Sequence, residues 1–82
     1  QWPALCRHRV TEVREAAADA AKEHGTRAHV PLLAQMCGDV AEEVRLSAWL
    51  ALRDLLPEVE ASGYDFKDPT PDALAALQRI AK

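Results

Sequence analysis

Apolar residues recur at helical spacing in residues 10–22, where they form a single stripe of a helix with 3.6 residues per turn. The stripe consists of Val13, Ala17, Ala20 and Ala21. The opposite side of the same stretch is charged and carries Glu12, Glu15, Asp19, Lys22 and Glu23. We therefore predict an amphipathic helix, with Thr11 as its N-cap and Gly25 as its C-cap.

A second stretch, residues 39–56, repeats this stripe over a greater length. Its inward positions are Val44, Ala48, Ala51, Leu52 and Leu55. Asp39 and Glu42 indicate a capping box at its start, and Pro57 ends the helix. More apolar residues widen the arc beyond one face, namely Leu46, Trp49, Leu50 and Leu56. Such a wide arc predicts neighbouring helices on two sides.

Two shorter helices complete the pattern. One runs from Pro31 to Gly38, with the proline tolerated in its first turn. Residues 58–70 have no helical period, after which Thr70 caps a final helix that begins at Pro71. No segment alternates apolar and polar residues with a period of two, so we predict an all-α fold.

The two long helices belong to an internal repeat. Residues 13–21 align with residues 44–52 at an offset of 31. A second match places residues 2–5 over residues 30–33 at an offset of 28, which predicts a shorter connector in the first unit. Periods of this size are typical of stacked helical units.

These residues resemble HEAT repeats of the short kind. The motif Val-Arg-x-x-Ala occurs at residues 13–17 and 44–48, and Val-Pro-x-Leu occurs at residues 30–33. The resemblance implies that the valine and alanine positions face the paired helix. It also implies that the arginine bridges to an acidic residue in a neighbouring turn. Asp39 is the expected partner of Arg45, whereas no acid precedes Arg14 at the matching position.

The resemblance implies antiparallel helix pairs stacked as a short α-solenoid of about two and a half units with a C-terminal capping helix. We expect a single HEAT-like domain over residues 1–82, which is part of a longer chain. Its parts are a first unit at 2–24, a second unit at 28–56, an acidic aromatic loop at 57–70 and a terminal helix at 71–82. The polar outer side of that last helix consists of Gln78, Arg79 and Lys82.

Composition narrows the function. Sixteen alanines and four aromatic residues mean that alanine and leucine build the core, with Trp2 and Trp49 as filling between helices. A hydrophobic content of 49% with 28% charged residues argues against disorder, and a net charge of −3 gives no general attraction to nucleic acid. No apolar run is long enough to span a membrane. Two cysteines form no disulfide framework, so we expect an intracellular protein, with the cytoplasm favoured and the nucleus or an organelle left open.

Chemical sites are not expected in this sequence. Cysteine and histidine supply zinc ligands, but the spacing of Cys6, His8, His24, His29 and Cys37 matches no metal motif. Cys6 and His8 lie two residues apart, on different faces of a helix, and do not form a nucleophile and base. No glycine-rich phosphate loop occurs. We therefore predict no catalytic residue, no metal and no cofactor.

A protein partner is the favoured interpretation. HEAT repeats usually act as scaffolds, and this implies a non-catalytic protein-interaction or scaffolding module within a larger protein or complex. The candidate contact residues are Trp49 on the second long helix, and Tyr64 and Phe66 in the acidic loop. These two loop aromatics either anchor a basic partner or fold back over the helix ends.

Two other functions remain open at this level. The basic trio Arg7, Arg9 and Arg14 offers phosphate contacts, as a solenoid gripping a nucleic-acid backbone would require. The segment also fits an accessory or regulatory domain of an enzyme.

Overall fold

The structure of the chain is a computed structural model that describes residues 2–25 and 27–81, except for the side chains of Trp2 and Pro3. The roles predicted for Trp2 as filling and for Lys82 in the cap lie outside the described residues. All regular elements of the described part are helical, which confirms the all-α prediction. They are α1 (Trp2–Cys6), α2 (Thr11–His24), η1 (Arg27–His29), α3 (Val30–Met36), α4 (Glu42–Leu55), η2 (Pro57–Ser62) and α5 (Pro71–Ile80).

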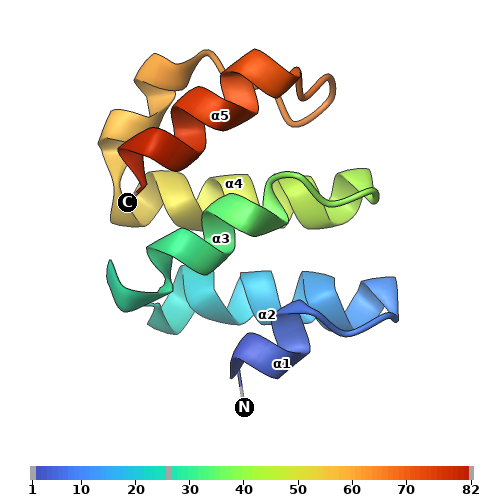
Figure 1. Cartoon of the computed structure of the whole chain (residues 1–82). Coiled ribbons are helices and arrows are strands. Elements are labelled where there is room, and N and C mark those ends of the chain that lie inside the picture. Colours follow the sequence, from blue (N-terminus) through green and yellow to red (C-terminus); the bar gives the residue numbers. More distant parts are fainter. Residues whose placement is uncertain (1, 26, 82) are drawn as a thin grey trace.

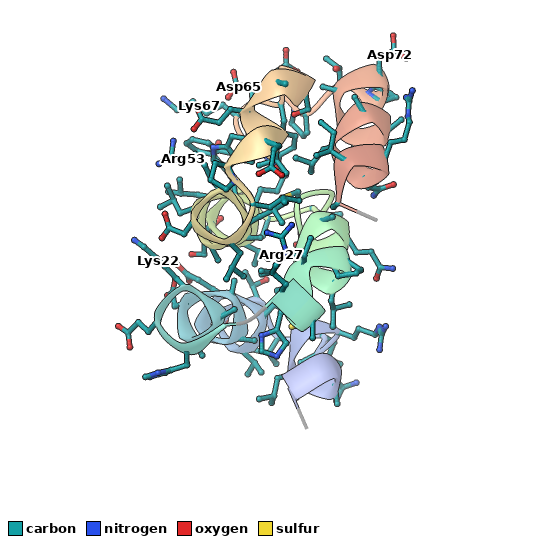
Figure 2. All side chains as sticks on the ribbon, turned by 90° about the vertical axis from the view of Figure 1, so that its left-hand side faces the viewer. Lys22, Arg27, Arg53, Asp65, Lys67 and Asp72 are labelled. Carbon is teal, nitrogen blue, oxygen red and sulfur yellow. The ribbon has the colours of Figure 1, made fainter. Side chains whose placement is uncertain are left out.

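The helices form two layers (Figures 1 and 2). One layer holds α1, α3 and α5, and the other holds α2, α4 and η2, with contacts between successive members of each layer. In each of the two units the chain passes first through the α1 and α3 layer and then through the other. At the C-terminal end this order is reversed, because η2 lies in the α4 layer and α5 then returns to the α3 layer. This last pair therefore closes the end of both layers, as expected of a capping helix.

Only one of the three predicted helix N-caps is present in the structure. Thr70 caps α5, because its hydroxyl accepts a hydrogen bond from the amide of Ala73 at 3.2 Å. The prediction of Thr11 as an N-cap is wrong, since α2 already includes this residue and Val10 takes the cap position. The capping box at Asp39 is also wrong, because α4 begins at Glu42 and its N-cap is Ala41.

Gly25 ends α2, as predicted, although not by adopting a left-handed conformation. Its φ of −73° is open to any residue, and its amide donates to the carbonyl of Ala21 at 2.7 Å. A Cβ atom at this position would clash with that same carbonyl oxygen and would lie 3.2 Å from Cδ1 of Leu55. Close packing of α2 against the end of α4 therefore explains the glycine.

Alanine builds much of the core between α2 and α4. The fully or almost fully buried residues of these helices are Ala17, Ala18, Ala21, Val44, Ala48, Ala51 and Leu52. The stripe predicted for the second long helix is thus confirmed, with Leu55 partly buried at its end. In α2 the stripe is rotated, because Ala20 is exposed and Ala18 is fully buried.

The segment after Pro57 is more regular than its sequence suggests. It forms the short 3-10 helix η2, and Val59 of that helix is fully buried. Gly63 follows with a φ of 74°, a left-handed conformation that favours glycine. The chain then turns back over α4, which places Tyr64 in the core.

The two units share a single register along their connectors. After α1 the amide of Arg7 donates to the carbonyl of Ala4, and after α3 the amide of Gly38 donates to the carbonyl of Gln35. Both pairs of residues are related by the same offset as the two long helices. The shorter offset predicted for the segment 2–5 is therefore wrong as a structural register. The first connector, residues 7–10, is one residue shorter than the second, residues 37–41, and α1 corresponds to the last part of α3.

Candidate protein-docking surface

Three loops lie at the same end of the helices, on the right in Figure 1, and the arginines of α2 and α4 hold them in place. In chain order they comprise residues 7–10, 37–41 and 63–70. Arg14 donates from Nη1 to the carbonyl of His8, in the loop before its own helix, at 2.7 Å. Arg45 repeats this bond in the second unit, from Nη1 to the carbonyl of Asp39, also at 2.7 Å. Each long helix is thus tied to the loop that leads into it.

The same arginines also reach the loop of the next unit. Nε and Nη2 of Arg14 donate to the two carboxylate oxygens of Asp39, at 2.6 and 3.0 Å. Nε of Arg45 donates to the carbonyl of Phe66 at 2.7 Å. We call this chain of bonds the arginine ladder; it comprises Arg14, Asp39 and Arg45 with the carbonyls of His8 and Phe66.

The ladder corrects the prediction that Asp39 is the partner of Arg45. Arg45 donates a hydrogen bond to the backbone carbonyl of Asp39, while the carboxylate of Asp39 pairs with Arg14. The acid that Arg14 lacks within its own unit is supplied by the following unit. Stacking therefore continues the ladder across the junction that the sequence left open.

The ion pair of Arg14 and Asp39 is largely shielded from solvent, with 12% and 11% of the side chains exposed. Burial disfavours the charged form of Asp39. The hydrogen bonds from Arg14 and from the amide of Ala41, with the charges of Arg14 and Arg45, outweigh burial and lower the pKa of the carboxyl group. The hydrogen bond to Asp39 raises the pKa of Arg14.

Tyr64, one of the predicted contact residues, belongs to the core. Its hydroxyl donates to the carbonyl of Cys37 at 2.6 Å, and only 8% of the residue is exposed. Its ring lies 5.1 Å from that of Trp49, measured between centroids and at a tilt of 43°. Burial raises the pKa of Tyr64. The structure thus brings together two of the predicted aromatics and joins the third loop to the second.

The remaining predicted residues lie apart from this pair. Phe66 is half-buried against the core, and the ammonium of Lys67 lies 5.9 Å from the centroid of its ring. Arg7 and Arg9 are exposed, whereas Arg14 is held in the ladder. The predicted basic trio therefore does not form a set of three free cations.

Reactive groups are few. Burial raises the pKa of the Cys37 thiol to about 12 and that of the Cys6 thiol to about 11. Among the described residues no group of three or more histidine, cysteine or acidic side chains could hold a metal ion. The surface hollow between α1 and α3 has a volume of about 170 Å³ and that between η2 and α5 about 220 Å³. Both are smaller than the roughly 300 Å³ from which ligand pockets begin.

The outer side of α4 carries two leucines of the wide apolar arc that the sequence predicted, although they were not among the predicted contact residues. Leu46 and Leu50 are half-buried, one helical turn apart. Trp49 and Leu55 of the same helix pack against the core, but Leu46 and Leu50 are not among the described residues that do so. The repeat contained the signal, because Glu15 and Asp19 occupy the corresponding positions of α2 in the first unit.

We call this outer side of α2 and α4 the docking face. It is defined by Glu15, Asp19, Lys22, Leu46, Leu50 and Arg53. Figure 2 shows Lys22 and Arg53 on the left, on the side of these helices that faces away from α3 and α5. Exposed acidic side chains are frequent on these two helices, which also carry Glu12, Glu23, Glu42, Glu43 and Asp54.

No curated protein and no solved structure matches this chain. None of the helices in the described part has the length and apolar character needed to cross a membrane. Residues 29–59 match the family model of the HEAT repeat. HEAT repeats generally mediate protein–protein interaction or scaffolding and are generally not catalytic. The match covers α3, α4 and the start of η2, which form the unit predicted from Val-Pro-x-Leu and Val-Arg-x-x-Ala, so this part of the chain is a HEAT-like repeat.

Proposed function

We propose that the chain is a non-catalytic protein-interaction module of a larger protein or complex, and that it binds its partner through the docking face. The observation that carries this proposal is the pair Leu46 and Leu50. Both leucines lie outside the core, and their side chains are only partly covered. In the corresponding positions of α2 the same fold has acids, so stability does not require an apolar residue there.

The chemistry of the partner follows from the surroundings of this pair. Two leucines at i and i+4 form a short apolar ridge along α4, which matches the apolar stripe of an amphipathic helix. Glu15 and Asp19 occupy the equivalent positions of α2, which packs against α4, and Glu43 lies about one turn before Leu46. Acids around an apolar centre favour a partner with basic residues beside its apolar stripe.

The predicted contact residues contribute to this proposal to different degrees. Trp49 lies on α4 between the two leucines in sequence and is half-buried against the core, so it lies at the border of the docking face rather than within it. The ring of Tyr64 packs against that of Trp49, and the backbone carbonyl of Phe66 ties its loop to Arg45. The free buried cysteines support an intracellular, reducing compartment.

A synthetic probe tests the docking face. The probe is a fluorescent amphipathic helix of five turns with leucines at i and i+4 spacing and lysines beside them, and its control is a scrambled peptide of the same composition. We expect fluorescence anisotropy to show binding of the first peptide only, weakened at least tenfold by Leu46→Ser with Leu50→Ser. Ala75→Ser on the exposed side of α5 serves as the matched control and leaves binding unchanged. Equal binding of both peptides, or binding that survives the double substitution, contradicts the proposal.

A further inference from the structure

The side of α1 and α2 that faces away from α3 and α4 differs in burial from the equivalent side of the second unit. Leu5 is 44% exposed, whereas Met36, which occupies the same position of the second unit, is 4% exposed. Val13 is half-buried, whereas Val44 is fully buried. The same fold position is thus covered in one unit and open in the other.

The small residues of α2 show the same difference. Ala16 and Ala20 are exposed. Their counterparts on α4 are Ser47, which is 8% exposed, and Ala51, which is fully buried. In the second unit these positions are covered because α2 packs on α4 and α1 packs on α3. We define the stacking face as Leu5, Val13, Ala16 and Ala20.

The loop at the end of the arginine ladder favours an acidic residue on any unit that packs against this face. At the equivalent loop positions, Oδ1 of Asp39 accepts from the amide of Ala41 at 2.9 Å, and Nδ1 of His8 accepts from the amide of Val10 at 3.1 Å. The second oxygen of Asp39 then accepts from Arg14. A histidine that accepts through Nδ1 carries its proton on Nε2, so His8 offers a donor where Asp39 offers an acceptor.

The neighbours of His8 strengthen this preference. Arg7 and Arg9, on either side of it, are both exposed. The loop at this end of the ladder therefore presents only donors and positive charge from these three side chains. A further arginine at the position equivalent to Arg14 would find no acceptor among these three side chains, whereas a carboxylate would accept from them.

We propose that the stacking face packs against a further helix pair of the same polypeptide, joined ahead of α1, that carries a glutamate or aspartate at the position equivalent to Arg14. The chain runs from α2 into α3, and it would run from the added helix pair into α1 in the same way. The added pair would therefore form the same kind of interface as that between the two existing units. The proposal does not depend on the docking face.

An extended chain tests the proposal. A copy of residues 2–32 is placed directly ahead of Trp2, so that every copied residue precedes its original by one full repeat. Two versions are compared by thermal unfolding, one with the copied Arg14 and one with Arg14→Glu in the copy. We expect the glutamate version to unfold in one transition, above the original chain and at least about 4 °C above the arginine version.

A second substitution separates the ladder from stacking alone. His8→Asp in the original unit restores the acceptor found at Asp39, so the arginine version should become the more stable of the two. The original chain with His8→Asp corrects for the effect of that substitution itself. The proposal is overturned if the glutamate version stays the more stable of the two whether residue 8 is histidine or aspartate. It is also overturned if the added unit unfolds separately from the rest.

A bulky side chain on the stacking face provides the matched control. Ala20→Arg should lower the melting temperature of the glutamate version but not of the original chain, in which Ala20 is exposed. If Ala20→Arg leaves the extended chain unchanged, α2 does not pack there and the proposal fails.

Discussion

Replacing Asp39 with asparagine removes the charge at the centre of the arginine ladder while keeping the size of the side chain. The carboxylate accepts hydrogen bonds from Arg14 at 2.6 and 3.0 Å and from the amide of Ala41 at 2.9 Å. Asparagine can keep the bond to Ala41 but offers Arg14 only one acceptor and leaves its charge unpaired. Hydrogen bonds to charged groups contribute about 1.5 to 3 kcal/mol. We therefore expect Asp39→Asn to lower the free energy of unfolding by about 2 kcal/mol.

Urea unfolding at pH 7, followed by circular dichroism, measures this loss. Asp54→Asn on the exposed side of α4 is the matched control and should change the free energy by less than about 0.5 kcal/mol. Arg14→Gln, alone and with Asp39→Asn, completes a double-mutant cycle that isolates the interaction of the pair. Additive losses in that cycle, or an Asp39→Asn variant as stable as the unchanged chain, would refute the role assigned to the ladder.

The pH dependence of the same pair has a defined sign. Folding lowers the pKa of Asp39, from about 3.9 in an unfolded chain. A carboxylate of this kind stabilises the fold fully above its unfolded pKa, and the contribution is lost as the pH falls through the folded pKa. We therefore expect the stability difference between the unchanged chain and Asp39→Asn to be constant from pH 7 to about 5 and to shrink below about pH 4.

Three further substitutions or reactions test other contacts. Trp49→Ala should cost about 2 kcal/mol in urea unfolding, less than a fully buried tryptophan, because the residue is only half-buried and packs on Tyr64; a loss above about 4 kcal/mol would contradict this partial burial. Gly25→Ala should lower the melting temperature because its Cβ would strike the carbonyl of Ala21, and an unchanged melting temperature would contradict that contact. Iodoacetamide at pH 8 should modify Cys37 only as fast as the chain unfolds, since burial raises its thiol pKa to about 12, and rapid labelling of the folded chain would contradict this.

Helical periodicity predicted the elements because each long helix buries one stripe against a partner of its own kind. Thr70 and Pro71 marked a helix start correctly, since their capping depends only on the residues that follow. The capping prediction at Asp39 failed because α4 begins later, at Glu42, so the carboxylate accepts from the amide of Ala41 in the loop instead. A local motif also cannot show that Arg14, far earlier in the chain, binds the same carboxylate.

The docking face was predictable only in part. The apolar arc of α4 is evident in the sequence, and it predicted neighbours on two sides. Periodicity alone does not say which of its residues remain outside the core, because that depends on where α2, α3 and η2 pack. Glu15 and Asp19 occupy the positions of Leu46 and Leu50 in the first unit, and these acids indicate that both positions lie outside the core. Tyr64 and Phe66 could not be divided between core and surface, because their placement depends on how the third loop folds back on α4.

Site-specific photo-crosslinking tests most directly whether the docking face binds a protein. A benzophenone side chain is introduced at Leu50, and for comparison at Gln78 on the exposed side of α5, in the full-length protein within its own cells. We predict that position 50 crosslinks to a defined partner, that Leu46→Ser abolishes this crosslink, and that position 78 does not form it. The same crosslinks at both positions, or none at position 50, would contradict the assignment of the docking face.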